Sequence, residues 1–256
     1  MGIDFSIEEL TIYMLVFCRM GGVIFLNPLL SRKNVPAQFK IALVLGLTLF
    51  IAPMRQASQV DFPNTLLLMA AIVREISIGV GFGFIFQVFY YLLFMVGDIV
   101  DMGFGLSMAK AFDPGTNLQV SITGNLLQFL FALYFFTVDG HLILIRMAAS
   151  TFDFIELGAA VWGSHALSVL IALFVDAFSL VMHLALPFIA ASFILEIAMG
   201  VLMKLIPQIN VFSLHFQIKI IFGFLLLFLF SVPISGFLDQ YLAALFASMK
   251  KLIAVL

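Results

Sequence analysis

The stretch GDIVDMGFGLSMAKAFDPGTNLQVS, residues 97–121, differs from the long apolar runs on both sides of it. Apolar side chains alternate in it with residues that loosen or charge the chain: Gly97, Asp98, Asp101, Gly103, Gly105, Lys110, Asp113 and Gly115. Asp113-Pro114-Gly115 is typical of a turn, because Asp bonds its own backbone, Pro presets φ and Gly accepts a positive φ. A long loop that stays apolar does not suit open solvent, so we expect it to line or seal a cavity.

The composition indicates a membrane protein. Of the 256 residues, 64% are hydrophobic and 10% are charged, whereas a soluble domain has about 45–50% apolar and about 25% charged residues. The net charge of −2 gives no electrostatic case for binding nucleic acid. The single cysteine, Cys18, excludes an internal disulfide and a metal site made of several cysteines. The N-terminus is acidic where a signal peptide is basic, so we expect no cleaved targeting segment.

The hydrophobic pattern predicts an all-α protein. A spanning helix needs about 20 apolar residues; the second apolar segment is short for that, and the third and fourth are long but interrupted. We therefore expect broken helical hairpins more than six clean spans, followed by an amphipathic tail at 239–256. The apolar segments are 10–30, 40–54, 66–96, 122–149, 166–195 and 216–237.

Proline and glycine predict where these segments break. Asn27-Pro28 ends the first segment, because the residue before a proline disfavours helix. Asp139-Gly140-His141 cuts the fourth segment, and Pro187 and Pro233 lie in the fifth and sixth. The third segment contains the GxxxG pattern of Gly79 to Gly83. That pattern lets two helices approach closely, although a kink explains it equally well.

Charged and histidine side chains lie in or against the apolar runs. Each charge costs about 2.5–3.5 kcal/mol at the bilayer centre on insertion scales, so most of them must find partners in this chain or another. We favour structural pairing over a proton relay, because no acidic residues repeat at i+3 or i+4 inside one span. Arg74 and Glu75 point to different helix faces, so each should pair elsewhere. The groups are Arg19, Arg74, Glu75, Asp139, His141, Arg146, Asp176, His183 and Glu196.

Motifs for catalysis, metal or cofactor binding do not occur in the sequence. The four histidines lack zinc-site spacing, and there is no P-loop, GxGxxG or GxSxG. Asp98 and Asp101 are three residues apart and could share a helix face, where capping of a helix before the loop is favoured over metal binding. We therefore predict no enzyme, no metal and no cofactor.

Several motifs together resemble the FliR family of the flagellar type III export gate, whose injectisome counterparts share the pattern. The resemblance runs nearly end to end, and its most specific piece is Pro207, Gln208, Asn210 and Phe212. His215 departs from the family, which more often has glycine there. The motifs are VPAQFKIAL at 35–43, REISIGVGFG at 74–83, GDIVDMGFG at 97–105, FDP at 112–114, DGH at 139–141 and PQINVFSLHFQIKI at 207–220.

The resemblance implies a non-enzymatic, pore-forming subunit of the bacterial inner membrane and the flagellar basal body. It implies a core complex with FliP and FliQ, association with FlhB and FlhA, and passage of unfolded export substrates. The chain would be a single export-gate domain, 1–256. Its parts would be N-terminal hairpins at 1–96, a plug loop at 97–121, and C-terminal hairpins with the tail at 122–256.

The loop would act as a plug in the pore. We predict that Phe104, Leu106, Met108 and Phe112 form the sealing surface, with Asp113 and Pro114 fixing the turn. Gly97, Gly103 and Gly105 would be hinges; Arg74, Glu75, Asp98, Asp101, Asp139 and Glu196 would be structural charges. For the four apolar side chains, ordinary packing between helices is the alternative.

Two other classes of function compete with an export gate. A secondary transporter would use the intramembrane carboxylates, but such proteins usually show two related halves, and no convincing internal repeat is found. A lipid-modifying membrane enzyme needs a cluster of catalytic groups, which the sequence lacks.

Overall fold

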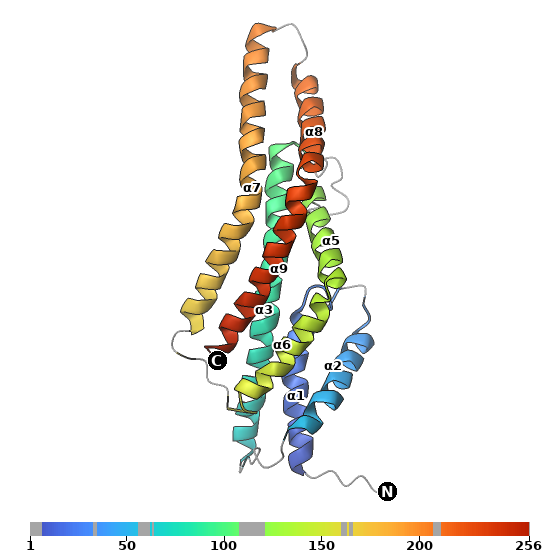
Figure 1. Cartoon of the computed structure of the whole chain (residues 1–256), viewed down its shortest axis with the longest axis vertical. Coiled ribbons are helices and arrows are strands. Elements are labelled where there is room, and N and C mark those ends of the chain that lie inside the picture. The colour runs from blue at the N-terminus through green and yellow to red at the C-terminus, as the bar shows by residue number, and fades with distance from the viewer. Residues whose placement is uncertain are drawn as a thin grey trace. The chain divides into compact units, whose positions relative to one another are not determined.

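The computed structural model describes all residues except 1–6, 33–34, 56–61, 63, 108–120, 160–162, 164–165, 207–210 and 256. All the regular structure in these described residues is helical, which confirms the predicted all-α class (Figure 1). The elements are α1 (Ile7–Leu26), α2 (Ala37–Ile51), the 3-10 helix η1 (Ala52–Met54), α3 (Thr65–Gly103), α5 (Ile122–Thr137), α6 (Gly140–Phe154), α7 (Ala166–Leu205), α8 (Val211–Leu229) and α9 (Ser231–Ile253).

Four of the described stretches are long and apolar enough to cross a membrane as single helices: α1, α2 with η1, α3 and α7. Two further candidate spans are bent pairs, with 72° between α5 and α6 and 60° between α8 and α9. The break at Asp139-Gly140 is therefore confirmed, as is the end of the first helix before Asn27-Pro28. Broken spans and continuous ones occur together in this chain.

The expected interruption of the third segment is wrong. α3 runs unbroken for 39 residues, and α7 continues for 40 residues through Pro187. Membrane helices tolerate an internal proline because neighbouring groups satisfy the freed carbonyl. The glycines of α3 serve close packing instead of a kink. A Cβ on Gly79 would overlap the carbonyl of Arg19, and one on Gly83 would overlap Leu26.

The chain divides into two compact units. The first unit is 1–89, 138–174 and 245–256, and the second is 90–137 and 175–244. These units do not coincide with the predicted division of the chain into parts before and after the 97–121 loop. That predicted division stays a prediction.

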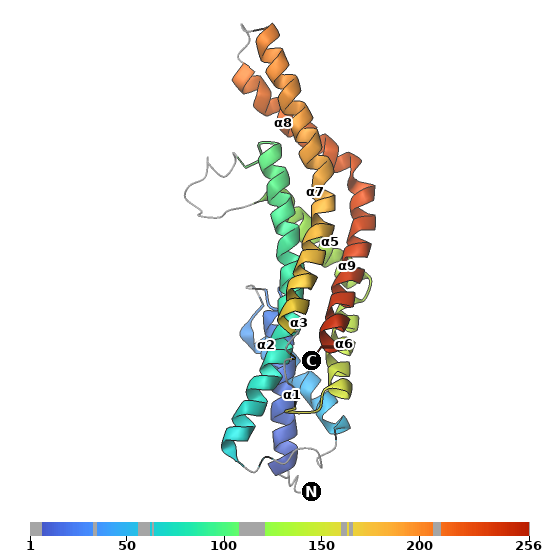
Figure 2. The ribbon, with the colours of Figure 1, turned by 90° about the vertical axis from the view of Figure 1, so that its left-hand side faces the viewer.

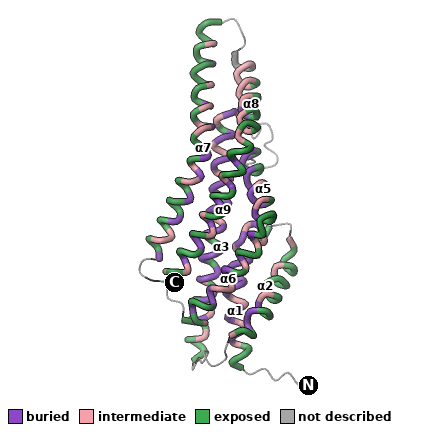
Figure 3. The backbone as a smooth tube through the Cα atoms, in the orientation of Figure 1, coloured by how far each residue is buried: buried purple, intermediate pink, exposed green. Residues whose placement is uncertain are grey.

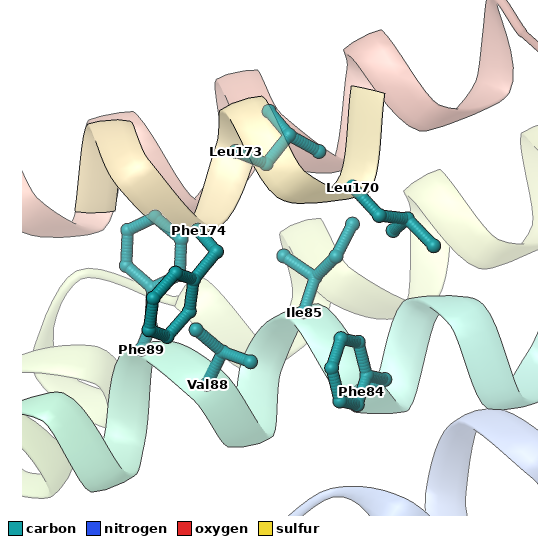
Figure 4. A pocket seen from close by; sticks show the side chains of 7 residues that line it. All are labelled: Phe84, Ile85, Val88, Phe89, Leu170, Leu173 and Phe174. Atoms are coloured by element: carbon teal, nitrogen blue, oxygen red, sulfur yellow. The ribbon is translucent and has the colours of Figure 1, made fainter. Parts of the chain in front are cut away.

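In the first unit, α1 packs on the first half of α3 (Figure 2). Gly22 of α1 faces Gly79 of α3, where an added Cβ would come within 2.8 Å of the facing backbone. The first turns of α7 also pack near α3, around a small groove lined only by apolar side chains (Figure 4). These are Phe84, Ile85, Val88, Phe89, Leu170, Leu173 and Phe174.

The second unit contains a core of aromatic and aliphatic side chains. Val100, Phe104 and Phe188 are buried together, with Phe222 and Phe230 packed against them. α7 and α8 run side by side beyond this core, where α7 is largely exposed and α8 is mostly half-buried (Figures 1 and 3). The exposed side chains of α7 there include Phe193, Ile197 and Leu205, and Phe228 of α8 is exposed at the level of the core. Such a surface suits contact with lipid or with other hydrophobic helices.

Candidate functional site: the base of the 104–121 loop

The predicted loop of 97–121 begins later in the structure, because residues 97–103 belong to α3. Residues 104–107 form a turn after α3, and Ser121 directly precedes α5. Four predicted plug residues lie outside the described residues: Met108, Phe112, Asp113 and Pro114. The described part of the candidate site is therefore the base of the loop.

A buried carboxylate joins the two ends of the loop. Asp101, in the last turn of α3, is 1% exposed. The hydroxyl of Ser121 donates to its Oδ2 at 2.7 Å. The backbone N–H of Thr123 donates to its Oδ1 and Oδ2 at 3.2 and 3.3 Å. Hydrogen bonds to an ionised group are the stronger kind in proteins, so this is a firm tie between α3 and α5.

Ser121 is itself the N-cap of α5. Its Oγ accepts the backbone N–H of Gly124 at 2.9 Å, which satisfies an otherwise orphan donor of the first turn. A carboxylate beside a helix N-terminus is also favoured by the helix dipole. The sequence assigned Asp101 to capping of a helix before the loop; the structure shows that it caps the helix after the loop.

The same aspartate holds the other end through its backbone. The N–H of Ser107 donates to the carbonyl oxygen of Asp101 at 3.3 Å. Asp101 thus binds the outgoing stem of the loop with its main chain and the returning stem with its side chain. We call Asp101, Ser107, Ser121 and Thr123 the stem clamp.

The turn between α3 and the rest of the loop is built around Gly105. Its φ of +74° is a left-handed conformation that L side chains rarely adopt. Phe216 and Lys219 of α8 lie beside it, 3.5 Å and 4.0 Å from where a Cβ would be. The backbone conformation at position 105 therefore requires a glycine.

Phe104 and Leu106 lie on the buried side of this turn. Phe104 is 0% exposed and packs on Gly223 and on the ring of Phe222, 6.3 Å between centroids. Leu106 is also buried. The described contacts of Phe104 are ordinary packing between helices. The sealing role of Phe104 and Leu106 stays a prediction.

The other two predicted hinges are in α3 itself. A Cβ on Gly97 would overlap the backbone of Gly124 in α5. Gly103 ends the helix, and a Cβ there would lie 3.2 Å from the side chain of Ser192. Gly97 thus brings α3 and α5 together just behind the stem clamp, and hinge motion at either glycine stays a prediction.

The predicted structural charges occupy separate places. Glu75 is fully buried and accepts two hydrogen bonds from Arg19, at 2.5 and 2.9 Å, and one from the N–H of Gly158 at 2.8 Å. Arg74 donates to the carbonyl of Gly158 at 3.1 Å. Glu75 therefore pairs with Arg19 and not with Arg74, while both neighbours bond to the backbone of Gly158.

The remaining charges lie near breaks or on α7. Asp139 has a φ of 55° at the bend between α5 and α6, and its carbonyl accepts from Leu142 and Ile143. Asp98 is half-buried in α3. The carboxylate of Glu196, in α7, pairs with Lys219 of α8 at 2.5 Å, and His215 lies 3.6 Å from it.

Ser121 and Arg19 are central to these networks and were not among the predicted site residues. Ser121 precedes an apolar run, which is a helix-start signal that the sequence offers. Arg19 is a charge in an apolar run, but no sequence pattern identifies its partner 56 residues away. Of the family motif, Pro207, Gln208 and Asn210 lie outside the described residues, and Phe212 is in the first turn of α8. Among the described residues, no group of His, Cys, Asp and Glu is placed to hold a metal ion.

Fold and site together define a helical integral membrane protein with a tethered loop between two of its helices. Residues 10–245 match the model of the family described as bacterial export proteins, family 1, and the chain belongs to that family. It is thus a non-enzymatic component of a bacterial export apparatus. The predicted family and the predicted membrane location are confirmed.

Relatives from distant bacteria resemble the chain over most of its length. The flagellar biosynthetic protein FliR of Escherichia coli K12 is 29% identical over 96% of this chain and 94% of the relative. FliR of Bacillus subtilis 168 is 27% identical over 84% of each chain. FliR of Caulobacter vibrioides is 26% identical over 83% of this chain and 85% of the relative.

Proposed function

We propose that this chain is a pore-forming subunit of the flagellar type III export gate, which passes unfolded export substrates across the inner membrane. The observation that carries the proposal is the family match over residues 10–245. That the relatives from three bacteria are all named flagellar biosynthetic proteins favours a flagellar gate over an injectisome gate.

A loop between helices would seal this pore when it is idle. A secretion pore must pass any side chain and still hold back ions, and apolar side chains close a pore by contact and by dewetting. Phe104, Leu106, Met108 and Phe112 would provide that surface, with Asp113 and Pro114 shaping the turn. Gly105, with its positive φ, is the best supported of the proposed hinges.

The gate would be a complex with FliP and FliQ, associated with FlhB and FlhA. The exposed apolar faces of α7 and α8 support this assembly: only 28% of the most apolar window of α7 is buried within this chain. Purification in mild detergent, followed by identification of the co-purifying chains, tests the partners. Two small hydrophobic partners are expected; a stable, monodisperse monomer would contradict the assembly.

Deletion of residues 106–115 tests the seal. Cells carrying the deletion should leak small solutes while the complex still assembles, because the apolar surface is removed and the helices are not. Unchanged permeability with an assembled complex would refute the sealing role.

Two substitutions test the transporter alternative. Asp98→Asn and Asp176→Asn keep the side-chain shape and remove the charge, so secretion should stay largely intact if these groups are structural. A complete loss of transport that depends on pH would support an ion relay instead.

A further inference from the structure

We infer that Asp101 is the positioning residue of the export gate, and that the stem clamp stays closed while substrates pass. This inference rests on the proposed sealing role of the loop. The stem clamp would then be the fixed base of the loop, and a passing chain would displace only the part of the loop beyond it.

The first argument is that one residue reaches both stems. The carbonyl of Asp101 accepts from Ser107 on the outgoing stem, and its carboxylate accepts from Ser121 and Thr123 on the returning stem. Rotation of either stem away from α3 breaks bonds to the same residue. Asp101 therefore links the two stems directly.

The second argument is burial. Asp101, Ser121 and Thr123 are each no more than 1% exposed. Opening the clamp would leave a buried carboxylate without its donors, and removing a hydrogen bond to a charged group shifts an equilibrium roughly ten- to a hundredfold. Because breaking these hydrogen bonds is so unfavourable, we expect the clamp to stay closed through every cycle of transport.

The third argument is the close fit behind the clamp. A Cβ on Gly97 would overlap the backbone of Gly124, and a Cβ on Gly124 would lie 2.8 Å from the carbonyl of Phe94. α3 and α5 therefore have no room to slide at this point. Gly105 lies between Asp101 and Ser107, so a closed clamp also fixes the hinge predicted there.

The test replaces the clamp by a bond that can be made and broken. In a Cys18→Ala background, which removes the chain's single cysteine, the Asp101→Cys/Ser121→Cys pair is expressed in the full export complex. Copper phenanthroline oxidises the pair and dithiothreitol reduces it. Solute leak and export of a reporter substrate are measured in both states and normalised to co-purified complex.

We expect the reduced pair to leak roughly tenfold or more above wild type, since the hydrogen bonds to the carboxylate are lost. Oxidation should restore the seal and leave export running. Asp101→Ala and Ser121→Ala should leak as the reduced pair does, whereas Asp98→Asn, one turn earlier on α3, should not. Either single cysteine variant should show no response to the oxidant.

Two results would overturn the inference. A reduced pair that stays sealed in an assembled complex would show that the clamp does not position the loop. An oxidised pair that blocks export would show that the clamp must open. Deletion of residues 106–115 distinguishes this inference from the proposed sealing role. If the deletion variant leaks and the reduced pair does not, the positioning role of the clamp is refuted and the sealing role of the loop stands. If the deletion variant stays sealed, both roles are refuted.

Discussion

The buried ion pair between Arg19 and Glu75 allows a prediction in which two damaging substitutions repair each other. Arg19 is 1% exposed and Glu75 is 0% exposed. Removal of one partner of a buried pair leaves the other charge without compensation, which costs about 3–5 kcal/mol. We expect this loss of stability from Glu75→Leu alone and from Arg19→Met alone.

The double variant Arg19→Met/Glu75→Leu removes both charges and should lose less than either single variant. What remains is mainly the N–H of Gly158, which loses its acceptor on Glu75 and costs about 1–3 kcal/mol as an unsatisfied buried donor. Thr151 keeps its own bond to the carbonyl of Ala148 at 2.6 Å. The ranking of the three variants therefore follows from counting uncompensated groups.

Heat-induced aggregation of the detergent-solubilised complex measures this ranking, together with the amount of full-length chain in membranes. At about 2–4 °C per kcal/mol, the single variants should lower the midpoint by roughly 6–20 °C. The matched control is Asp153→Asn, whose ion pair with Arg55 is 59% exposed on the carboxylate side and is worth about 0–1 kcal/mol. The reasoning is refuted if the double variant loses the sum of the two single losses, or if Glu75→Leu loses no more than Asp153→Asn.

Three further substitutions probe other parts of the fold, by the same thermal assay. Gly79→Ala should be strongly destabilising because its Cβ overlaps the backbone of α1, whereas Gly46→Ala, with nothing within 4 Å, should be neutral or slightly stabilising; equal effects would contradict the close helix crossing. Asp139→Val should cost about 1–2 kcal/mol because a β-branched residue resists the positive φ at this bend, while Asp139→Gly should be tolerated; a harmless valine would mean that the bend is not left-handed. Glu196→Gln should cost at most about 1 kcal/mol because its pair with Lys219 is half-exposed, and a larger loss would place that pair in a buried interface of the complex.

Helix positions follow from the sequence where a local rule decides them. Asn27-Pro28 ends α1, and Asp139-Gly140 separates α5 from α6, because proline and left-handed residues act on their immediate neighbours. The GxxxG of α3 was compatible with a close helix contact or a kink, and the structure has the contact. The same rules failed for α3 as a whole, since glycines that look like breaks from the sequence are held helical by the α1 backbone packed on them.

Partners across long distances do not follow from the sequence. Glu75 could pair with Arg19, Arg146 or a residue of another subunit on the evidence of spacing alone. The fold selects Arg19 because Gly22 and Gly79 bring α1 and α3 together one turn away from both charges. Asp101 is a similar case: capping was the right chemistry, but the capped helix begins on the far side of the loop.

Under the proposed sealing role, the base and the surface of this loop would use different physical interactions, each suited to what that part must do. Hydrogen bonds to a buried carboxylate are directional and costly to break, and the described ones lie at Asp101, where the stems must stay fixed. Apolar contacts are non-directional and scale with area, so they can separate around a passing chain of any sequence and then form again. A polar seal would bind some side chains and obstruct others. An apolar loop on a charged anchor can therefore be both indifferent to its substrate and accurate in its return.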